Sequence, residues 1–407
     1  MKKPSLLTQV SVAFVIAVVL GLIVGDKMAV VQPLGDLFLR LIKFIMAPLI
    51  LTTLIVGITS LQDTKQLFSM GGRTIVFYLV TTLIAVTIGI AYATILSPGT
   101  GANIALPKGA EAPAGEAPTI VETVLNMIPE NPFAALAEGN ILQIIFMAVA
   151  IGLGILFVGE PAKPVQKLFE AFSTVMFKIT SGVMVIAPIG IFGMVAPIIG
   201  EYGLSVLMPL AKVIIAVALG CVTQVLIAYS LAVKGFANMN PLTFLKGIAP
   251  AGLVAFSTAS SGATLPVSMK NVQENLGVSK KTASFVLPLG ATMNMDGSAI
   301  YQGVAALFIA QFYGIDLGMN EILLIMFTTT LASIGTAGVP GAGMIMLTMV
   351  LAAVNLPVEG IALIAAIDRV LDMFRTSVNI IGDAAASVVV DSYEKKQEQQ
   401  MSRTKSA

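Results

Sequence analysis

The sequence of 407 residues contains no histidine, a single cysteine (Cys221) and few charged side chains. Without histidine, the chain has neither the commonest metal ligand nor the usual proton shuttle. One cysteine can form neither a disulfide framework nor a cysteine-based metal cluster. Charged residues make up 11% of the chain, against about 25% in an average soluble domain, and 23 Lys+Arg nearly balance 22 Asp+Glu. The composition argues against a soluble enzyme and, with no basic excess, against nucleic acid as a partner.

Hydrophobic side chains account for 57% of the residues, and the mean hydropathy is +0.93. These values predict several membrane spans. The first apolar run has no small-residue cleavage site and is followed by many more, so we expect a span there and not a signal peptide. Runs long enough to cross about 30 Å of hydrocarbon lie near residues 6–25, 34–60, 74–97, 140–158, 172–199, 204–233, 241–272, 282–313, 320–355 and 358–391.

Basic residues predict which side of the membrane each loop faces. If each of the first six runs crosses once, the opposite side receives Lys27 and the loop 98–138, which carries Lys108 against five glutamates and which we expect outside. The cytoplasmic side then receives Lys2, Lys3, Lys65, Arg73, Lys163, Lys167 and Lys234.

Two apolar runs, 241–272 and 320–355, have interiors that are poor material for a helix at the bilayer centre. The first is rich in serine between Ser257 and Pro266, and the second is rich in glycine between Ser333 and Gly343. Two re-entrant helical hairpins would explain both stretches, because irregular backbone at that depth is tolerated where it lines protein or a water-filled cavity. Each hairpin precedes a helix with a polar motif, Asn294-Met-Asp296-Gly297 in the first case and Asn379-Ile-Ile-Gly382-Asp383 in the second, so the two units form an inverted repeat. Paired interrupted segments in an inverted repeat indicate a transporter site near the midplane. Two ordinary spans with glycine-lined helix contacts are the alternative.

The last apolar run carries ionisable residues on one face. At about 100° per residue, six polar positions share a sector about 100° wide: Asp368, Asp372, Arg375, Thr376, Asn379 and Asp383. Each charge would cost roughly 2.5–3.5 kcal/mol if it faced lipid, so these side chains must face a cavity or one another. The alternative interpretation of this polar face is a ladder of ion pairs with a structural role alone. The acids outnumber Arg369 and Arg375, however, and Asp296 adds another acid on a different span. An excess of buried carboxylates indicates a bound cation.

Four motifs in this order resemble those of the glutamate/aspartate transporters, the dicarboxylate/amino acid:cation symporters that include the archaeal aspartate transporters. The motifs are Asn294-Met-Asp296-Gly297, the serine-rich hairpin, the glycine-rich stretch 335–343 and Asp372-Met-Phe-Arg375-Thr376-x-x-Asn379-x-x-Gly382-Asp383. The resemblance implies an all-α membrane protein with eight transmembrane helices and two re-entrant helical hairpins in inverted repeats. It also implies the plasma membrane, or the inner membrane in a Gram-negative bacterium, with both termini cytoplasmic.

The same resemblance implies a homotrimer whose early spans form a scaffold, against which a transport domain moves in an elevator-type cycle. The scaffold would comprise residues 1–71 (spans 1 and 2), 140–163 (span 4) and 164–200 (span 5). The other expected parts are 72–98 (span 3, transport domain), 99–139 (extracellular loop), 201–236 (span 6, transport domain), 237–278 (re-entrant hairpin 1), 279–316 (span 7), 317–356 (re-entrant hairpin 2), 357–392 (span 8) and 393–407 (cytoplasmic tail).

The implied activity is symport of L-aspartate and/or L-glutamate with sodium, without a cofactor. By resemblance, Asp372 binds the substrate's ammonium and Arg375 binds its side-chain carboxylate, and a bidentate arginine suits a carboxylate. The N-termini of half-helices would offer partial positive charge to the α-carboxylate. The other implied substrate contacts are Ala259, Ser260, Ser261, Ser298, Val339, Pro340, Gly341, Ala342, Gly343, Thr376 and Asn379.

Three sodium positions also have counterparts, and their oxygen-only ligand sets suit a hard cation. The residues that resemble the first position are Gly290, Asn294, Asn379 and Asp383. Those that resemble the second are Thr292, Ser333, Ile334 and Thr336, and those that resemble the third are Tyr78, Thr81, Thr82, Asn294 and Asp296.

The chain departs from the family where archaeal members often carry an arginine before the hairpin serines and animal members carry one after the counterpart of Asp372. Here these positions are Ala259 and Met373, and Arg369 is the nearest spare arginine. A proton-coupled glutamate symporter or a C4-dicarboxylate symporter of the same family is the main alternative. An intramembrane enzyme would leave the inverted repeat unexplained, and a channel does not need an Asp/Arg pair suited to a zwitterion.

Overall fold

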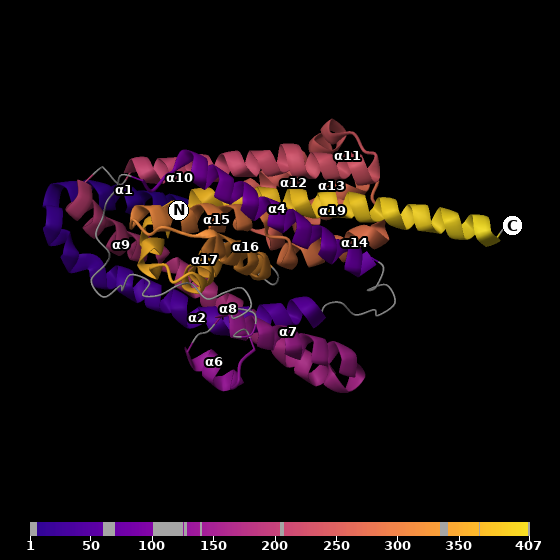
Figure 1. Cartoon of the computed structure of the whole chain (residues 1–407), viewed down its shortest axis with the longest axis horizontal. Helices are drawn as coiled ribbons and strands as arrows, with labels where there is room; N and C mark the ends of the chain where they lie inside the picture. The colour runs from indigo at the N-terminus through magenta and orange to yellow at the C-terminus, as the bar shows by residue number, and fades with distance from the viewer. Residues whose placement is uncertain are drawn as a thin grey trace, which may run out of the picture.

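The computed structural model describes residues 6–59, 70–100, 125, 128–138, 141–203, 207–333, 341–365 and 367–405 (Figure 1). Every regular element within these ranges is a helix, as an all-α protein requires, and they contain no strand. Among the described residues, four helical segments are long and apolar enough to cross a membrane: Val12–Phe38, Gly72–Leu96, Leu207–Ala237 and Asp368–Gln397. Five shorter apolar helical stretches accompany them. The chain has the helices of a membrane protein, and the arrangement of eight spans with two re-entrant hairpins stays a prediction.

One group of helices combines the start of the chain with its middle. The helix α2 packs against α7, α8 and α9, while α1 packs along α9. Gly193 of α9 lies so close to α2 that a Cβ atom there would be 2.5 Å from the backbone nitrogen of Gly35. The elements of this group are α1 (Leu6–Val24), η1 (Gly25–Val31), α2 (Gln32–Thr59), α6 (Pro132–Glu138), α7 (Ile141–Val158), η3 (Glu160–Ala162), α8 (Lys163–Val185) and α9 (Ala187–Tyr202).

The second group surrounds α15 (Asp296–Phe312), which is buried around almost its whole circumference. The helices α4, α10, α16, α17 and α19 all pack on α15, and α12, α13 and α14 cover α19. The other elements of this group are α4 (Gly72–Leu96), α10 (Leu207–Thr223), the π-helical η5 (Gln224–Tyr229), α11 (Ser230–Ala237), α12 (Pro241–Thr258), α13 (Ser261–Glu274), α14 (Lys280–Met293), α16 (Met319–Ser333), α17 (Ala342–Ala353), η6 (Val358–Gly360), α18 (Ile361–Ala365) and α19 (Asp368–Lys405).

Helices in the second group are interrupted at the polar motifs. α12 ends where Ala259 adopts a left-handed conformation (φ 49°), and Ser260 then caps α13 by accepting a hydrogen bond from the backbone N–H of Ala263. The expected single span 279–316 is broken between α14 and α15, because Asn294 and Met295 leave the helical conformation. α16 and α17 pack against each other, and the segment 334–340 that joins them lies outside the described residues. Within 393–405, expected as a tail, the chain continues α19, which projects in yellow toward the C-terminus (Figure 1).

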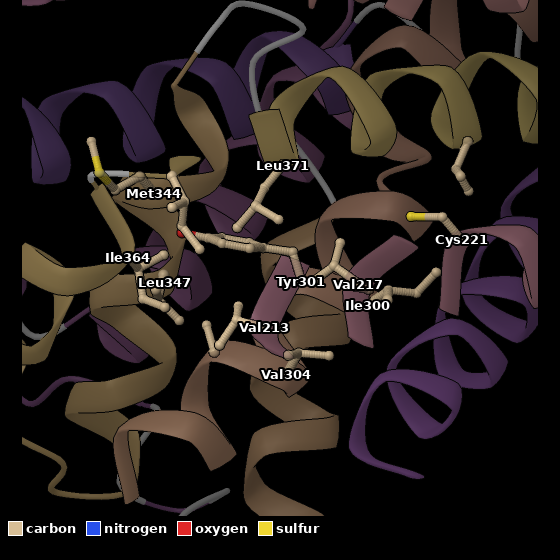
Figure 2. Packing of buried hydrophobic residues seen from close by; sticks show 14 of the residues in the cluster. Val213, Val217, Cys221, Ile300, Tyr301, Val304, Met344, Leu347, Ile364 and Leu371 are labelled. Atoms are coloured by element: carbon tan, nitrogen blue, oxygen red, sulfur yellow. The ribbon is translucent and has the colours of Figure 1, made fainter. Parts of the chain in front are cut away.

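The apolar core of the second group lies where α10, α15, α17, α18 and α19 meet. Figure 2 shows Tyr301 in the middle of a cluster whose labelled members include Val213, Met344 and Leu371. Cys221 is buried in the same cluster, where it packs as a small apolar side chain. This core fixes α15 against α19 and so positions the polar face of α19.

The contact between α15 and α19 yields a test of stability. A Cβ atom on Gly297 would overlap the backbone carbonyl oxygen of Arg375 and lie 2.6 Å from its Cα. Because backbone cannot move aside easily, Gly297→Ala should destabilise the fold by about 1–3 kcal/mol, the usual cost of overpacking. The measurement is the apparent melting temperature of purified protein in detergent without substrate.

Gly235→Ala on α11 is the matched control, because nothing lies within 4 Å of the added Cβ atom. The alanine should be neutral or stabilising there, since glycine is the poorer helix former by about 1 kcal/mol. An unchanged melting temperature for Gly297→Ala would contradict the close contact.

Candidate functional site: a buried charged face on α19

The structure buries all six polar residues of the predicted face of α19. The exposed fraction of each of these residues is at most 6%, and Arg375 is fully buried. α12, α13, α14 and α15 cover this helix. The periodicity argument therefore places these residues correctly inside the protein, away from lipid.

Arg375 lies between two carboxylates and an aromatic ring. Its Nη1 donates to Oδ1 of Asp368 at 2.9 Å, and its Nη2 lies 2.8 Å from Oδ1 of Asp372. The guanidinium carbon is 4.1 Å from the centre of the Tyr301 ring, a cation–π distance. Gly343 at the start of α17 packs against the same guanidinium, where a Cβ atom would be 3.0 Å from Nη1. A fully buried guanidinium needs such compensation, because an unpaired buried charge costs several kcal/mol.

The second carboxylate oxygen of Asp372 links α19 to the start of α17 and, through Arg369, to the end of α12. Its Oδ2 accepts a hydrogen bond from the backbone N–H of Gly341 at 3.1 Å, just before α17. Nη1 of Arg369 lies 3.9 Å from the same oxygen, and Nη2 of Arg369 donates to the carbonyl of Thr258 at 3.4 Å. The structure thus contains the ladder of ion pairs that was the alternative interpretation of this face. Through Gly341 and Thr258, the ladder reaches the start of α17 and the end of α12.

Asp296 is held by hydrogen-bond donors from two other helical segments. Its Oδ1 accepts from Thr82 at 2.7 Å, and its Oδ2 accepts from Tyr229 at 2.7 Å and from Gln224 at 3.0 Å. All four residues are completely buried. This carboxylate is therefore compensated by neutral donors and not by an arginine in the described part of the chain.

A third cluster surrounds the break between α14 and α15. The amide nitrogen of Asn294 donates to Oδ1 of Asp383 at 2.9 Å and to the carbonyl of Asn379 at 3.1 Å. Oδ1 of Asn379 accepts from the backbone N–H of Gly297 at 2.8 Å, and its Nδ2 donates to the sulfur of Met295. Oδ1 of Asn294 is buried without a hydrogen-bond partner among the described residues.

Gly290 of α14 and the hydroxyl of Tyr78 lie next to that cluster. A Cβ atom on Gly290 would overlap Oδ1 of Asp383 and lie 2.5 Å from the hydroxyl of Tyr78, which donates to the carbonyl of Val286 at 3.0 Å. No group of three or more His, Cys, Asp or Glu that could hold a metal occurs within the described ranges. A cation here would therefore rest on one carboxylate together with amide, hydroxyl and carbonyl oxygens, the ligand types that hard cations accept.

The remaining predicted residues are less directly connected. Thr81, Thr292 and Ser333 each donate to a carbonyl three residues earlier in the same helix. Ser298 and Thr376 are buried where the start of α15 meets α19, and Ser261 and Ala259 are buried between α12 and α13. Ala342 begins α17. Four predicted residues lie outside the described part of the chain: Ile334, Thr336, Val339 and Pro340.

Sequence reasoning missed three residues that contact the charged groups: Gln224, Tyr229 and Tyr301. Gln224 carried a usable signal, since an amide within an apolar run is expensive and needs a partner. The π-helical turn Gln224–Tyr229 carried none, although such turns are frequent at functional sites. Tyr301 is indistinguishable in sequence from an ordinary buried aromatic residue.

An all-helical chain that buries carboxylates and an arginine among apolar helices is built like a membrane transport protein, in which such residues mark substrate and ion sites. Residues 6–393 match the sodium:dicarboxylate symporter family. The chain is 37% identical over 404 residues to the proton/sodium-glutamate symport protein of Geobacillus stearothermophilus, covering 97% of this chain and 96% of that protein.

Two other relatives have different named substrates. Identity is 35% over 402 residues to the proton/glutamate-aspartate symporter of Escherichia coli (strain K12), covering 93% and 92% of the two chains. It is 35% over 394 residues to a C4-dicarboxylate transport protein of Bacillus subtilis (strain 168), covering 95% and 93%. The chain belongs to the sodium:dicarboxylate symporter family, which confirms the resemblance seen in the motifs. It is a transporter and not an enzyme.

The compensation of Asp296 can be tested by removing one donor. Tyr229→Phe deletes the 2.7 Å hydrogen bond to Oδ2 and keeps the buried ring. A hydrogen bond to a charged group contributes about 1.5–3 kcal/mol, so the melting temperature in detergent should fall clearly. Tyr92→Phe is the control, because the hydroxyl of Tyr92 pairs with the neutral hydroxyl of Thr223 at 2.8 Å and with no carboxylate among the described residues. Equal losses in the two variants would argue against a charged Asp296 as the acceptor.

Proposed function

We propose that the protein is a secondary active transporter that carries L-aspartate and/or L-glutamate together with sodium. Membership in the symporter family and relatives named for glutamate, aspartate and C4-dicarboxylates support a dicarboxylate or acidic amino acid as substrate. The observation that carries the proposal further is the buried pair of Asp372 and Arg375. Its opposite charges match the ammonium and the side-chain carboxylate of one acidic amino acid.

Binding would proceed by exchange of ion pairs. The carboxylate of the incoming side chain replaces Oδ1 of Asp372 at Nη2 of Arg375, and Asp372 then takes the substrate's ammonium. Asp368 keeps its 2.9 Å contact with Nη1 throughout. The buried charges stay paired before and after this exchange, which avoids the penalty of an isolated ion in an apolar interior.

The α-carboxylate would be bound by the N-terminal ends of two helices. α13 begins after Ser260, and α17 begins after Gly341, so their first backbone N–H groups and positive dipole ends suit an anion. We assign the remaining contacts to Ala259, Ser261, Ser298, Thr376 and Asn379, and to the stretch from Val339 to Gly343.

Sodium would be carried at three oxygen-rich positions. The cluster of Asn294, Asp383, Asn379 and Gly290 forms the first, and its support is the buried, unpartnered Oδ1 of Asn294. Thr292, Ser333, Ile334 and Thr336 form the second. The carboxylate of Asp296 with Thr82, Thr81, Tyr78 and Asn294 forms the third. No cofactor is required.

The two helix groups support a division into scaffold and transport domain. The helices α1, α2, α7, α8 and α9, assigned to spans 1, 2, 4 and 5, form one packed group. The helices α4 and α10, assigned to spans 3 and 6, pack instead on α15 of span 7 and α19 of span 8. We propose that the second group moves against the first in an elevator-type cycle within a membrane-embedded homotrimer. Both termini face the cytoplasm in this arrangement.

The coupling ion is tested with proteoliposomes. Sodium coupling is expected because the chain has no histidine. It is also expected because Gln302, which cannot titrate, stands where the family resemblance implies a glutamate as proton carrier in the proton-coupled animal members. Aspartate should accumulate when a sodium gradient is imposed and should not accumulate in sodium-free vesicles with an inward proton gradient. Robust uptake in the sodium-free arm, unchanged by added sodium, would favour a proton-coupled glutamate symporter, the alternative within the family.

The role of Asp372 is tested against its neighbour Asp368, since both acids contact Arg375. Asp372→Asn should weaken aspartate binding about 30-fold or more, because leaving the ammonium unpaired costs about 2–5 kcal/mol. Asp368→Asn should keep aspartate binding within a few-fold of wild type, since Asp368 does not receive the ammonium. Calorimetric titration with aspartate measures both variants.

A comparable loss in Asp368→Asn and Asp372→Asn would show that the ammonium is not received by Asp372 specifically. Near-normal affinity in Asp372→Asn would favour a C4-dicarboxylate, which has no ammonium to bind.

A further inference from the structure

Arg369 is the one charged group of the site that the proposed exchange does not use. It follows Asp368 in the first turn of α19, and its side chain is 16% exposed. Nη2 donates to the carbonyl of Thr258, the last residue of α12. Nε and Nη1 are buried and have no hydrogen-bond partner among the described residues. The carbonyl of Thr258 is therefore the one hydrogen-bond acceptor of this guanidinium among the described residues.

The contact with Thr258 ties the first helix pair to α19. The C-terminal end of a helix carries partial negative charge and unpaired carbonyls, which a cation stabilises. α12 ends here because Ala259 turns into the left-handed conformation, with φ 49°. Arg369 thus lies beside the site, next to Oδ2 of Asp372, whereas Arg375 contacts Oδ1.

The contact with Asp372 affects the charge that a substrate meets. Oδ1 of Asp372 is compensated by Arg375 at 2.8 Å, and Oδ2 has Arg369 at 3.9 Å in addition to the N–H of Gly341. An ammonium that binds Asp372 therefore lies within a few ångströms of a second positive charge. A like charge at such a distance opposes binding in a partly solvated site.

We propose that Arg369 is a specificity-determining residue that weakens the preference of Asp372 for an ammonium and so lets the site accept a C4-dicarboxylate that has none. With Arg369, the two acids Asp368 and Asp372 and the two arginines sum to zero charge. Without it, the site carries one excess negative charge beside the position of the ammonium. This inference rests on the proposed function, in which Asp372 receives the ammonium of an acidic amino acid.

The experiment compares aspartate with succinate, which is similar in length and carries no ammonium. Inhibition of radiolabelled aspartate uptake by each unlabelled compound gives a ratio of apparent affinities in proteoliposomes. Succinate should compete measurably in the wild type. Arg369→Gln should raise the aspartate-to-succinate affinity ratio about tenfold, the order expected from removing a like charge about 4–6 Å away in a partly solvated site.

Three further variants separate charge from structure. Arg369→Lys keeps the charge and should leave the ratio within about twofold of wild type, whereas Arg369→Met removes the charge and should behave like Arg369→Gln even if that variant accumulates poorly. Arg73→Gln is the matched control, because Arg73 lies away from the site and forms an ion pair with Glu394 at 3.0 Å. The affinity ratio of this variant should not change. A purely structural role for Arg369 would weaken both compounds equally.

Three results would overturn the inference: no competition by succinate in the wild type, an unchanged or lowered ratio in the neutral variants, or a lysine variant that behaves like the glutamine variant. A wild-type protein that transports neither aspartate nor glutamate would overturn the proposed function, and this inference with it. A protein that transports aspartate with an unmoved ratio would overturn this inference alone.

Discussion

The fully buried guanidinium of Arg375 is the constraint on which the second helix group depends. In an apolar interior it requires counter-ions within hydrogen-bond distance, and it has Asp368 and Asp372 at 2.9 and 2.8 Å. Those acids must be buried too, so α19 has to be covered by α12, α13, α14 and α15. Glycine at position 297 allows the backbone of α15 to touch that of α19 beside Arg375. One charge thus determines how closely several helices approach.

Breaks in the helices create a second requirement, since each break leaves backbone groups without helical partners. At the junction of α14 and α15, the side chain of Asn379 supplies such a partner, and that of Asn294 links the junction to α19. Oδ1 of Asn379 accepts from the backbone N–H of Gly297, and the amide of Asn294 donates to the carbonyl of Asn379. An amide can donate and accept at once, which an ionised carboxylate cannot. The asparagines are therefore structural links between helices as well as candidate ligands.

The sequence was sufficient to predict the features that depend on a single helix. The spacing of Asp368, Asp372 and Asp383 predicted a buried face on α19, because periodicity determines which side chains share a side. Contacts between helices were not predictable in this way. The pairing of Arg369 with Thr258, or of Gln224 and Tyr229 with Asp296, depends on how separate helices pack, and the single sequence contains no direct record of that packing. The break at Asn294 was likewise hidden, since the apolar run continues through it.

The buried acids divide into two kinds, and the division explains how one site could bind an amino acid and cations together. Asp368 and Asp372 are compensated by Arg375, so a zwitterion with an extra carboxylate can exchange partners with them without changing the local charge. Asp296 and Asp383 have only neutral donors in the described structure: Thr82, Gln224 and Tyr229 for the first and Asn294 for the second. Two carboxylates without an arginine attract cations more strongly than a paired one does. Asn379 accepts from Gly297 of α15 through its side-chain Oδ1 and from Asn294, which also donates to Asp383, through its backbone carbonyl. A cation bound at Asp383 would therefore fix the turn of α19 that carries the side chain that the substrate is proposed to contact. Binding of cation and substrate would then favour the same arrangement of α15 and α19, which is the thermodynamic requirement for symport.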